Sequence, residues 1–343
     1  ARRGVCRGVE VHREPFWLLR GTTGRPCAGE MIGDGMRSDA RGSEPILYCR
    51  QLVTVILANE RLAAQHLRKR YGLSYGEYCC LQALAGAGGG QAGSEGLAGL
   101  LMLERTTVRK ILLGLEDRGC VQKVVSAGDG REMACSLTQK GLVLELQANK
   151  SVKRHLACAL LASLDEVELA RSKMWVTVDA LRGYRVSGFD GVETSCSFLD
   201  LSFFLYWRIL RESWSTVAAQ AGFPSLRAYR LLELLCECGA MGAGQAADLL
   251  AMRPSRFSLV KRDLIRMGLV QDQPSLTDGR VVSCAATAAG SACVRKARPQ
   301  FEVVTAQAHP HLTCDEALTL NVWYMRMYAN LRHWLANCSD DSK

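Results

Sequence analysis

The chain has few of the sequence patterns that carry catalysis or bind metal ions. It has no Walker pattern, no Gly-x-Ser-x-Gly and no evident pair of catalytic carboxylates. Its fifteen cysteines include no Cys-x-x-Cys pair. No metal-ligand spacing occurs among the six histidines, which are His12, His66, His155, His309, His311 and His333. We therefore expect no enzymatic activity, no cofactor and no metal site.

Long apolar runs are also missing. A membrane-spanning helix needs about 18 or more consecutive apolar residues, and the best stretch, Leu52–Leu57, is soon interrupted by Asn59 and Glu60. We expect a cytoplasmic protein that does not enter a membrane. In that compartment the cysteines are expected to be reduced core residues, and the alternative is a redox-sensing thiol, with Cys79 and Cys80 as the candidates.

Basic residues exceed acidic ones. The chain has 43 Lys and Arg against 34 Asp and Glu, a formal net charge of +9 over 343 residues. Hydrophobic residues make up 48% of the chain and charged residues 22%, which is ordinary for a protein with buried cores. The excess of positive charge suits a polyanionic partner, although many proteins without one share it.

The main positive feature is an internal duplication. Residues 97–141 and 246–290 align without a gap at an offset of 149, so that Leu115 corresponds to Leu264 and Gly119 to Gly268. Asp-Gly-Arg recurs at 129–131 and 278–280, and Thr-x-x-Gly recurs at 138–141 and 287–290. A repeat of about 140 residues is too long for a solenoid unit, so each copy should be a domain.

The duplication and the composition together suggest the domain boundaries. Residues 1–45 are rich in Gly and Arg and absent from the second copy, which predicts a disordered tail or an upstream translation artefact. The remaining boundaries are domain 1 at 46–186, a linker at 187–198, domain 2 at 199–335 and a tail at 336–343.

Each copy predicts four helices, a hairpin and two further helices. In the first copy Ser74-x-x-Glu77 forms a capping box, Ser94 is the expected N-cap of a short helix, and Thr106 begins the helix that follows. The glycine-rich stretch 85–96 is expected to be a flexible turn. Alternating apolar residues at 121–125 and 133–137 predict a two-stranded hairpin, and Thr138 caps a long helix that runs to about Leu161.

Two short helices followed by a tight hairpin are typical of a winged helix-turn-helix. Its second helix can enter the DNA major groove while the hairpin, or wing, meets the minor groove. The outward positions of the two predicted recognition helices are Thr106, Thr107, Arg109 and Lys110 in the first copy and Ser255, Arg256, Ser258 and Arg262 in the second. The alternative for each set is a solvated helix face.

These residues resemble the MarR family of bacterial transcription regulators. The resemblance rests on the run from Leu97 to Leu101, Thr106-Thr107-Val108-Arg109, the stretch from Leu115 to Val121, and Thr138-x-x-Gly141. It covers each copy almost end to end. It implies that Arg131 and Arg280 enter the minor groove and that Asp129 and Asp278 orient the wings or neighbouring basic side chains.

The resemblance also implies a dimer and an effector site. Members are usually single-domain homodimers whose first and last helices build the interface, whereas this chain carries both copies. Members commonly bind small aromatic acids beside those helices. In this chain the corresponding residues would be Trp175, Trp207, Trp214, Trp323 and Tyr324. The alternative is that these aromatics simply form the packed core.

The expected fold class is mainly α with small β-hairpin wings (α+β): tandem winged helix-turn-helix domains whose helical dimerisation regions form an intramolecular pseudo-dimer. The expected function is a DNA-binding regulator, in the first place a repressor, that reads two non-identical half-sites of double-stranded DNA. A small ligand or an oxidative signal would release it, and the resemblance implies a small aromatic acid as the ligand. The alternative is a degenerate MarR-like scaffold that binds a small molecule or a protein and reads no DNA.

Overall fold

The computed structural model describes residues 48–87, 90–125, 133–165, 201–274, 282–307 and 312–338. Several predictions fall outside these ranges: the tail at 1–45, the linker at 187–198, the last helix predicted for the first copy, and both wing tips.

The first half of the chain contains a run of helices interrupted by short strands. Its elements are α1 (Arg50–Tyr71), α2 (Tyr75–Gly86), β1 (Gln91–Gly93), α3 (Ser94–Leu101), α4 (Arg105–Asp117), β2 (Val121–Val125), β3 (Met133–Leu137), α5 (Gln139–Leu156) and the π-helical turn η3 (Ala157–Leu161).

The described elements of the second half follow the same order. They are α7 (Leu201–Gln220), α8 (Leu226–Cys238), β4 (Met241–Gly242), α9 (Ala243–Leu249), α10 (Pro254–Arg266), β5 (Val270–Pro274), β6 (Val282–Ala286), α11 (Ala288–Gln307) and α12 (Cys314–Cys338).

Local capping signals begin several of these helices where the sequence predicts. Ser74 and Glu77 form a reciprocal capping box, with Ser74 N to Glu77 Oε2 at 2.6 Å and Glu77 N to Ser74 Oγ at 3.2 Å. The side chain of Thr138 accepts from Gly141 N at 3.1 Å and begins α5. The helical path continues through η3 to Leu161. The predicted capping box at Ser74 and Glu77 and the predicted long helix after Thr138 are both confirmed.

Two sequence predictions about the glycine-rich stretch are wrong. Ser94 is the first residue of α3 and not its N-cap, because Gly93 holds that position in extended conformation. Gln91–Gly93 forms strand β1, which pairs with β3, so the expected two-stranded hairpin is a three-stranded antiparallel sheet of order β1-β3-β2. The second half has the equivalent sheet, β4-β6-β5.

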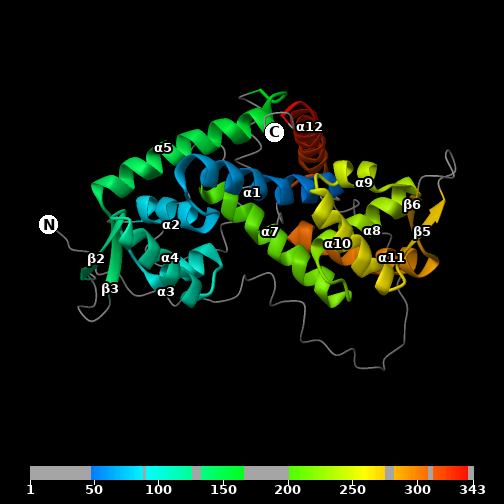
Figure 1. Cartoon of the computed structure of the whole chain (residues 1–343), viewed down its shortest axis with the longest axis horizontal. Helices are drawn as coiled ribbons and strands as arrows, with labels where there is room; N and C mark the ends of the chain where they lie inside the picture. Colours follow the sequence, from blue (N-terminus) through cyan, green and yellow to red (C-terminus); the bar gives the residue numbers. More distant parts are fainter. Residues whose placement is uncertain are drawn as a thin grey trace, which may run out of the picture.

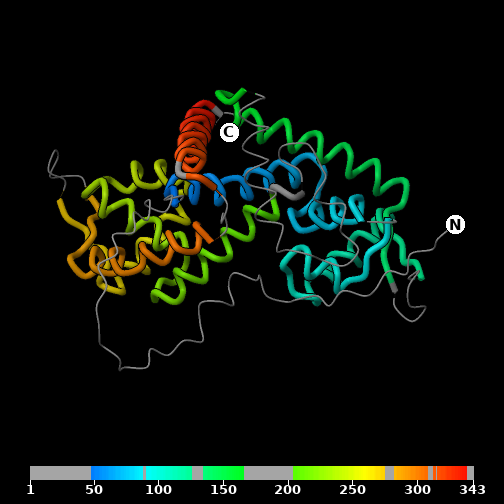
Figure 2. The backbone as a smooth tube through the Cα atoms, turned by 180° about the vertical axis from the view of Figure 1, so that it is seen from behind, coloured from blue at the N-terminus to red at the C-terminus, as the bar shows by residue number. Residues whose placement is uncertain are grey.

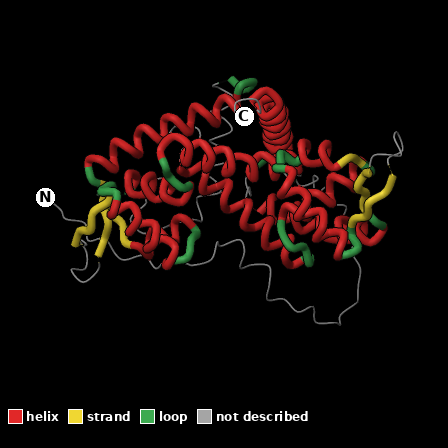
Figure 3. The backbone as a smooth tube through the Cα atoms, in the orientation of Figure 1, coloured by secondary structure: helices red, strands yellow, loops and turns green. Residues whose placement is uncertain are grey.

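The two small sheets lie at opposite ends of the molecule, and long helices fill the space between them (Figures 1 and 3). Helix α1 packs on α5 and α2 of its own half and on α12, α7 and α8 of the other half. Seen from behind, α1 and α12 again lie at the junction of the halves (Figure 2). The two halves therefore share a helical core.

Two hydrogen bonds cross this junction in corresponding ways, one from the first helix of each half. Arg61 on α1 donates a hydrogen bond to the carbonyl of Ala251, just after α9 in the second half. Arg208 on α7 donates one to the carbonyl of Leu101, at the end of α3 in the first half. The first helix of each half thus contacts the helix–turn–helix of the other half.

Candidate nucleic-acid interface

The helix–turn–helix of each half is built around a tight left-handed turn. Met102, between α3 and α4, has φ 51°, and Ala251, between α9 and α10, has φ 50°. The left-handed conformation costs a non-glycine residue roughly 1–2 kcal/mol, so the surrounding structure must impose it. These two residues occupy equivalent positions at the duplication offset of 149, and they set the angle at which each following helix leaves the turn.

Each following helix is anchored along one face. In α4 the buried residues are Val108, Leu112 and Leu115, spaced to form one stripe of the helix. In α10 they are Phe257, Val260 and Leu264. Burying one such side chain contributes roughly 1.5–3 kcal/mol relative to exposing it, which fixes the rotation of each helix about its axis.

This rotation places the predicted recognition residues at the surface. Every member of the two sets is exposed: Thr106, Thr107, Arg109 and Lys110 on α4, and Ser255, Arg256, Ser258 and Arg262 on α10. The two exposed faces differ in chemistry, because position 107 is a threonine where position 256 is an arginine, and Lys110 corresponds to Leu259.

An ion pair joins the first wing strand of each half to the preceding helix. The strand supplies the basic residue in the first half and the acidic residue in the second. In the first half Lys123 on β2 meets Glu116 on α4 at 2.8 Å. In the second half Asp272 on β5 meets Lys261 on α10 at 2.6 Å. Part of the basic charge of each helix–turn–helix and wing is therefore neutralised internally. The predicted wing residues Asp129, Arg131, Asp278 and Arg280 lie outside the described residues.

The aromatic residues predicted for an effector site lie in the core. The exposed fraction is 2% for Trp207, 0% for Trp214, 4% for Trp323 and 3% for Tyr324. The indole Nε1 of Trp214 donates to Thr305 Oγ1 at 2.9 Å, which satisfies its only polar atom inside the second half. Trp175 lies outside the described residues.

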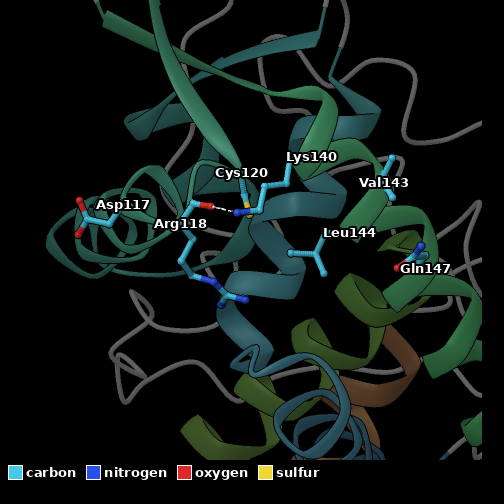
Figure 4. Close-up of a pocket in the computed structure, with 7 residues that line it drawn as sticks. All are labelled: Asp117, Arg118, Cys120, Lys140, Val143, Leu144 and Gln147. Atoms are coloured by element: carbon cyan, nitrogen blue, oxygen red, sulfur yellow. Dashed lines mark hydrogen bonds between the residues drawn. The ribbon is translucent and has the colours of Figure 1, made fainter.

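Two cavities open elsewhere on the described surface. One, of about 450 Å³, lies between the end of α4 and the start of α5 and is lined by Asp117, Arg118, Cys120, Lys140, Val143, Leu144 and Gln147 (Figure 4). The Lys140 ammonium closes one side by donating to the Arg118 carbonyl at 2.6 Å. The other, of about 550 Å³, lies between α1 and the second helix–turn–helix. None of the predicted aromatics lines either cavity.

The cysteines singled out as thiol sensors are buried on α2. Cys79 is 2% exposed and Cys80 is fully buried. Burial raises the pKa of the Cys79 thiol to about 11 and raises the pKa of Cys80 well above its usual range. Since the reactive species is the thiolate, both residues behave as core hydrophobes. The described ranges contain no group of three metal-ligating side chains and no helix able to cross a bilayer.

No protein-family model and no curated protein sequence matches the chain. Solved structures of bacterial and archaeal regulators show limited similarity. The transcriptional regulator BldR from Sulfolobus solfataricus is 20% identical, with a TM-score of 0.32 over 35% of this chain and 85% of its own. MarR C80S from E. coli complexed with operator DNA is 18% identical, with a TM-score of 0.29 over 35% of this chain and 82% of its own. CouR from Rhodococcus jostii RHA1 bound to p-coumaroyl-CoA is 19% identical, with a TM-score of 0.34 over 36% of this chain and 90% of its own.

Proposed function

We propose that this chain is a DNA-binding transcription regulator, acting as a repressor, in which two MarR-like winged-helix units form an intramolecular pseudo-dimer. The observation that carries the proposal is the pair of amphipathic helices, α4 and α10, each anchored on one face and exposing hydroxyl and cationic side chains on the other. Hydroxyls near a helix start suit phosphates, and arginine can read guanine edges.

The reciprocal contacts of Arg61 and Arg208 support the pseudo-dimer. Each links the first helix of one unit to the reading element of the other, as expected if one chain supplies both halves of a dimer. A single chain would then present two readers and bind as a monomer. Mass measurement combined with a footprint tests this, since a stable monomer should protect two half-sites about one helical turn apart. An obligate dimer of chains would count against it.

DNA binding is tested with single substitutions on each reader. Arg109→Ala and Arg256→Ala should each weaken binding to the chain's own upstream region by roughly tenfold or more, because a good arginine–base contact contributes about 1–3 kcal/mol. Arg332→Ala is the matched control, since it removes the same charge from an exposed position on α12. Binding should also weaken steeply with salt. Failure to bind any promoter fragment in a salt-sensitive manner would refute the proposal.

We further propose that the operator is not a perfect palindrome. Operator symmetry mirrors protein symmetry, and Thr107 and Lys110 cannot make the base contacts of Arg256 and Leu259. Selecting binding sites from random DNA measures this directly, and a strictly symmetric consensus would contradict it.

Release of DNA by a small aromatic acid or by oxidation is part of the same proposal. It is tested by measuring DNA affinity with and without salicylate-like acids, and separately with peroxide. If neither treatment changes the affinity, both release signals are wrong.

A second candidate is a MarR-like scaffold that does not read DNA. It is favoured by the internal neutralisation of Lys123 by Glu116 and of Lys261 by Asp272. If substitutions at Arg109, Arg256, Arg131 and Arg280 leave every measurable activity intact, this alternative becomes the better description.

A further inference from the structure

The cavity of about 550 Å³ lies at the junction of the two halves, beside the second reader. One wall is α1 of the first half. The opposite wall is formed by the start of α8, the turn after α9 and the start of α10. Its apolar lining consists of Leu57, Ala58, Ala64, Leu250, Ala251 and Met252. A ligand here would touch both halves of the chain at once.

The polar lining of this cavity is almost entirely cationic. Besides Gln65 it consists of five arginines, Arg61, Arg68, Arg227, Arg253 and Arg256, and no carboxylate of the described residues lines the cavity. None of the five makes an ion pair within the described ranges. Like charges gathered without counter-ions repel one another, so the arrangement is unfavourable until an anion enters.

Arg61 is the most buried part of this cluster. One nitrogen of its guanidinium donates to the Ala251 carbonyl, while its Nε is buried and has no hydrogen-bond partner among the described residues. Burial and the charges of Arg253 and Arg227 lower its pKa. Burial and the charge of Arg256 lower the pKa of Arg227, a shift that Glu60 only partly opposes. A buried donor without a partner is costly.

The corresponding junction in the first half is already neutralised. There Arg211 on α7 pairs with Glu60 and Glu212. The buried Arg208 donates to the Leu101 carbonyl, has a carboxylate oxygen of Glu60 at 4.0 Å, and lies 5.8 Å above the Tyr75 ring. The two junctions therefore differ, because Glu60 on α1 faces the first and Arg61, the next residue, faces the second.

We propose that the arginine-lined cavity binds a small molecule carrying phosphate groups, with two or more negative charges and an apolar part, and that the chain has this site in its second half alone. Guanidinium groups match phosphate oxygens in bidentate fashion. The volume lies within the range of small-molecule sites. The inference rests on the proposed function in one respect: Arg256 belongs both to the cavity and to the exposed face of α10, so ligand and DNA would compete for it.

The test measures binding of two probes, inorganic pyrophosphate and ADP, to the full chain by isothermal titration calorimetry at fixed ionic strength. Wild-type protein should bind both, and ADP should bind more tightly because its adenosine contacts the apolar lining. Arg227→Gln and Arg61→Gln should each weaken binding by at least about tenfold, the loss expected for one charge-assisted hydrogen bond. Arg332→Gln, which removes the same charge elsewhere, should bind as wild type.

Two further controls make the result decisive. Thermal unfolding of each variant shows whether it folds. Arg61→Gln removes the hydrogen bond to the Ala251 carbonyl, and if this variant is destabilised, the test rests on Arg227→Gln alone. Absence of binding at millimolar probe, or an equal loss in Arg332→Gln, would overturn the proposal. DNA affinity is then measured with and without ADP: ADP should weaken it in wild type but not in Arg227→Gln. If the protein binds ADP but no DNA, the cavity assignment stands and the regulator proposal fails.

Discussion

Substitution of Gly141 by alanine should strongly destabilise the first half. Gly141 lies in the first turn of α5, where the helix docks against the chain that leaves α4. A Cβ atom at this position would lie 1.9 Å from the carbonyl oxygen of Cys120, whereas real Cβ contacts essentially never fall below 3.0 Å. The helix start would have to move by at least about 1.1 Å, the difference between these distances.

That movement would break a small set of identifiable contacts. Thr138 N donates to the Cys120 carbonyl at 3.1 Å, and Thr138 Oγ1 donates to the Gly119 carbonyl at 2.8 Å. The Thr138 side chain also caps Gly141 N. Overpacking costs about 1–3 kcal/mol, and loss of a cap about 1 kcal/mol. We expect Gly141→Ala to lower the free energy of unfolding by about 2–4 kcal/mol and Tm by roughly 10 °C.

Gly114 provides the matched control within the same half. It lies inside α4, and a Cβ there would meet nothing within 4 Å. Glycine in a helix interior costs about 1 kcal/mol relative to alanine, so Gly114→Ala should stabilise the protein by up to that amount. Thermal unfolding followed by circular dichroism measures both variants. If Gly141→Ala unfolds within 2 °C of wild type, the close approach of α5 to Cys120 is not as described.

Two further predictions concern α2 and the contact of α1, α5 and α12. Ser74→Ala removes one side of the capping box with Glu77 and should lower the free energy of unfolding by about 1 kcal/mol, measured by urea unfolding. The ring of His155 stacks on the ring of His66, with 4.4 Å between the ring centroids, and meets the Trp334 ring edge to face at 5.2 Å between centroids. Burial, together with the charge of His66, lowers the pKa of His155 to about 4. Because the folded pKa lies below the unfolded value near 6.5, the unfolded chain takes up the proton first. Stability should therefore be complete above about pH 6.5 and decline as pH falls toward 4. His155→Gln should flatten that decline in thermal unfolding at a series of pH values, and an unchanged pH profile would contradict the assignment.

Features whose signals are local could be predicted from the sequence. The capping residues Ser74 and Thr138 lie where expected, because the side chain and the backbone groups it satisfies are three residues apart. The buried face of α4, Val108, Leu112 and Leu115, follows from helical periodicity alone. The outward orientation of the predicted recognition residues follows from the same periodicity.

Strand β1 could not be predicted because nothing local requires it. Its three residues follow a glycine-rich stretch, and a segment that short has no alternating pattern to detect. What makes it a strand is its pairing with β3, in which Ala92 lies opposite Cys135. Pairing brought about by residues more than forty positions away is a tertiary effect.

The arginine-lined cavity was missed for a related reason. Its members come from α1, α8, the turn before α10 and the start of α10, so that Arg61 and Arg253 are separated by almost two hundred residues. In the sequence, each of these arginines taken alone is indistinguishable from an ordinary surface cation. Of the aromatic residues chosen for an effector site, Trp207, Trp214, Trp323 and Tyr324 are instead buried in the core, where large aromatic side chains contribute most to packing.

The contacts of α1 give a physical reason why the two halves of one chain could behave differently from two identical subunits. In a symmetric dimer the first helix of each subunit meets its partner with the same side chains, so both crevices must carry the same charge. Here Arg61 on α1 contacts the second helix–turn–helix, while Arg208 on α7 contacts the first. Glu60 on α1 balances the charges of Arg208 and of Arg211, which is also on α7. Fusion allows each junction to change independently. One junction then has ion pairs, while the arginines at the other make none within the described ranges and lie beside α10. If the proposed ligand binds only at the second junction, it should change the position or charge of α10 and leave α4 in place, so it should weaken one of the two proposed half-site contacts rather than both.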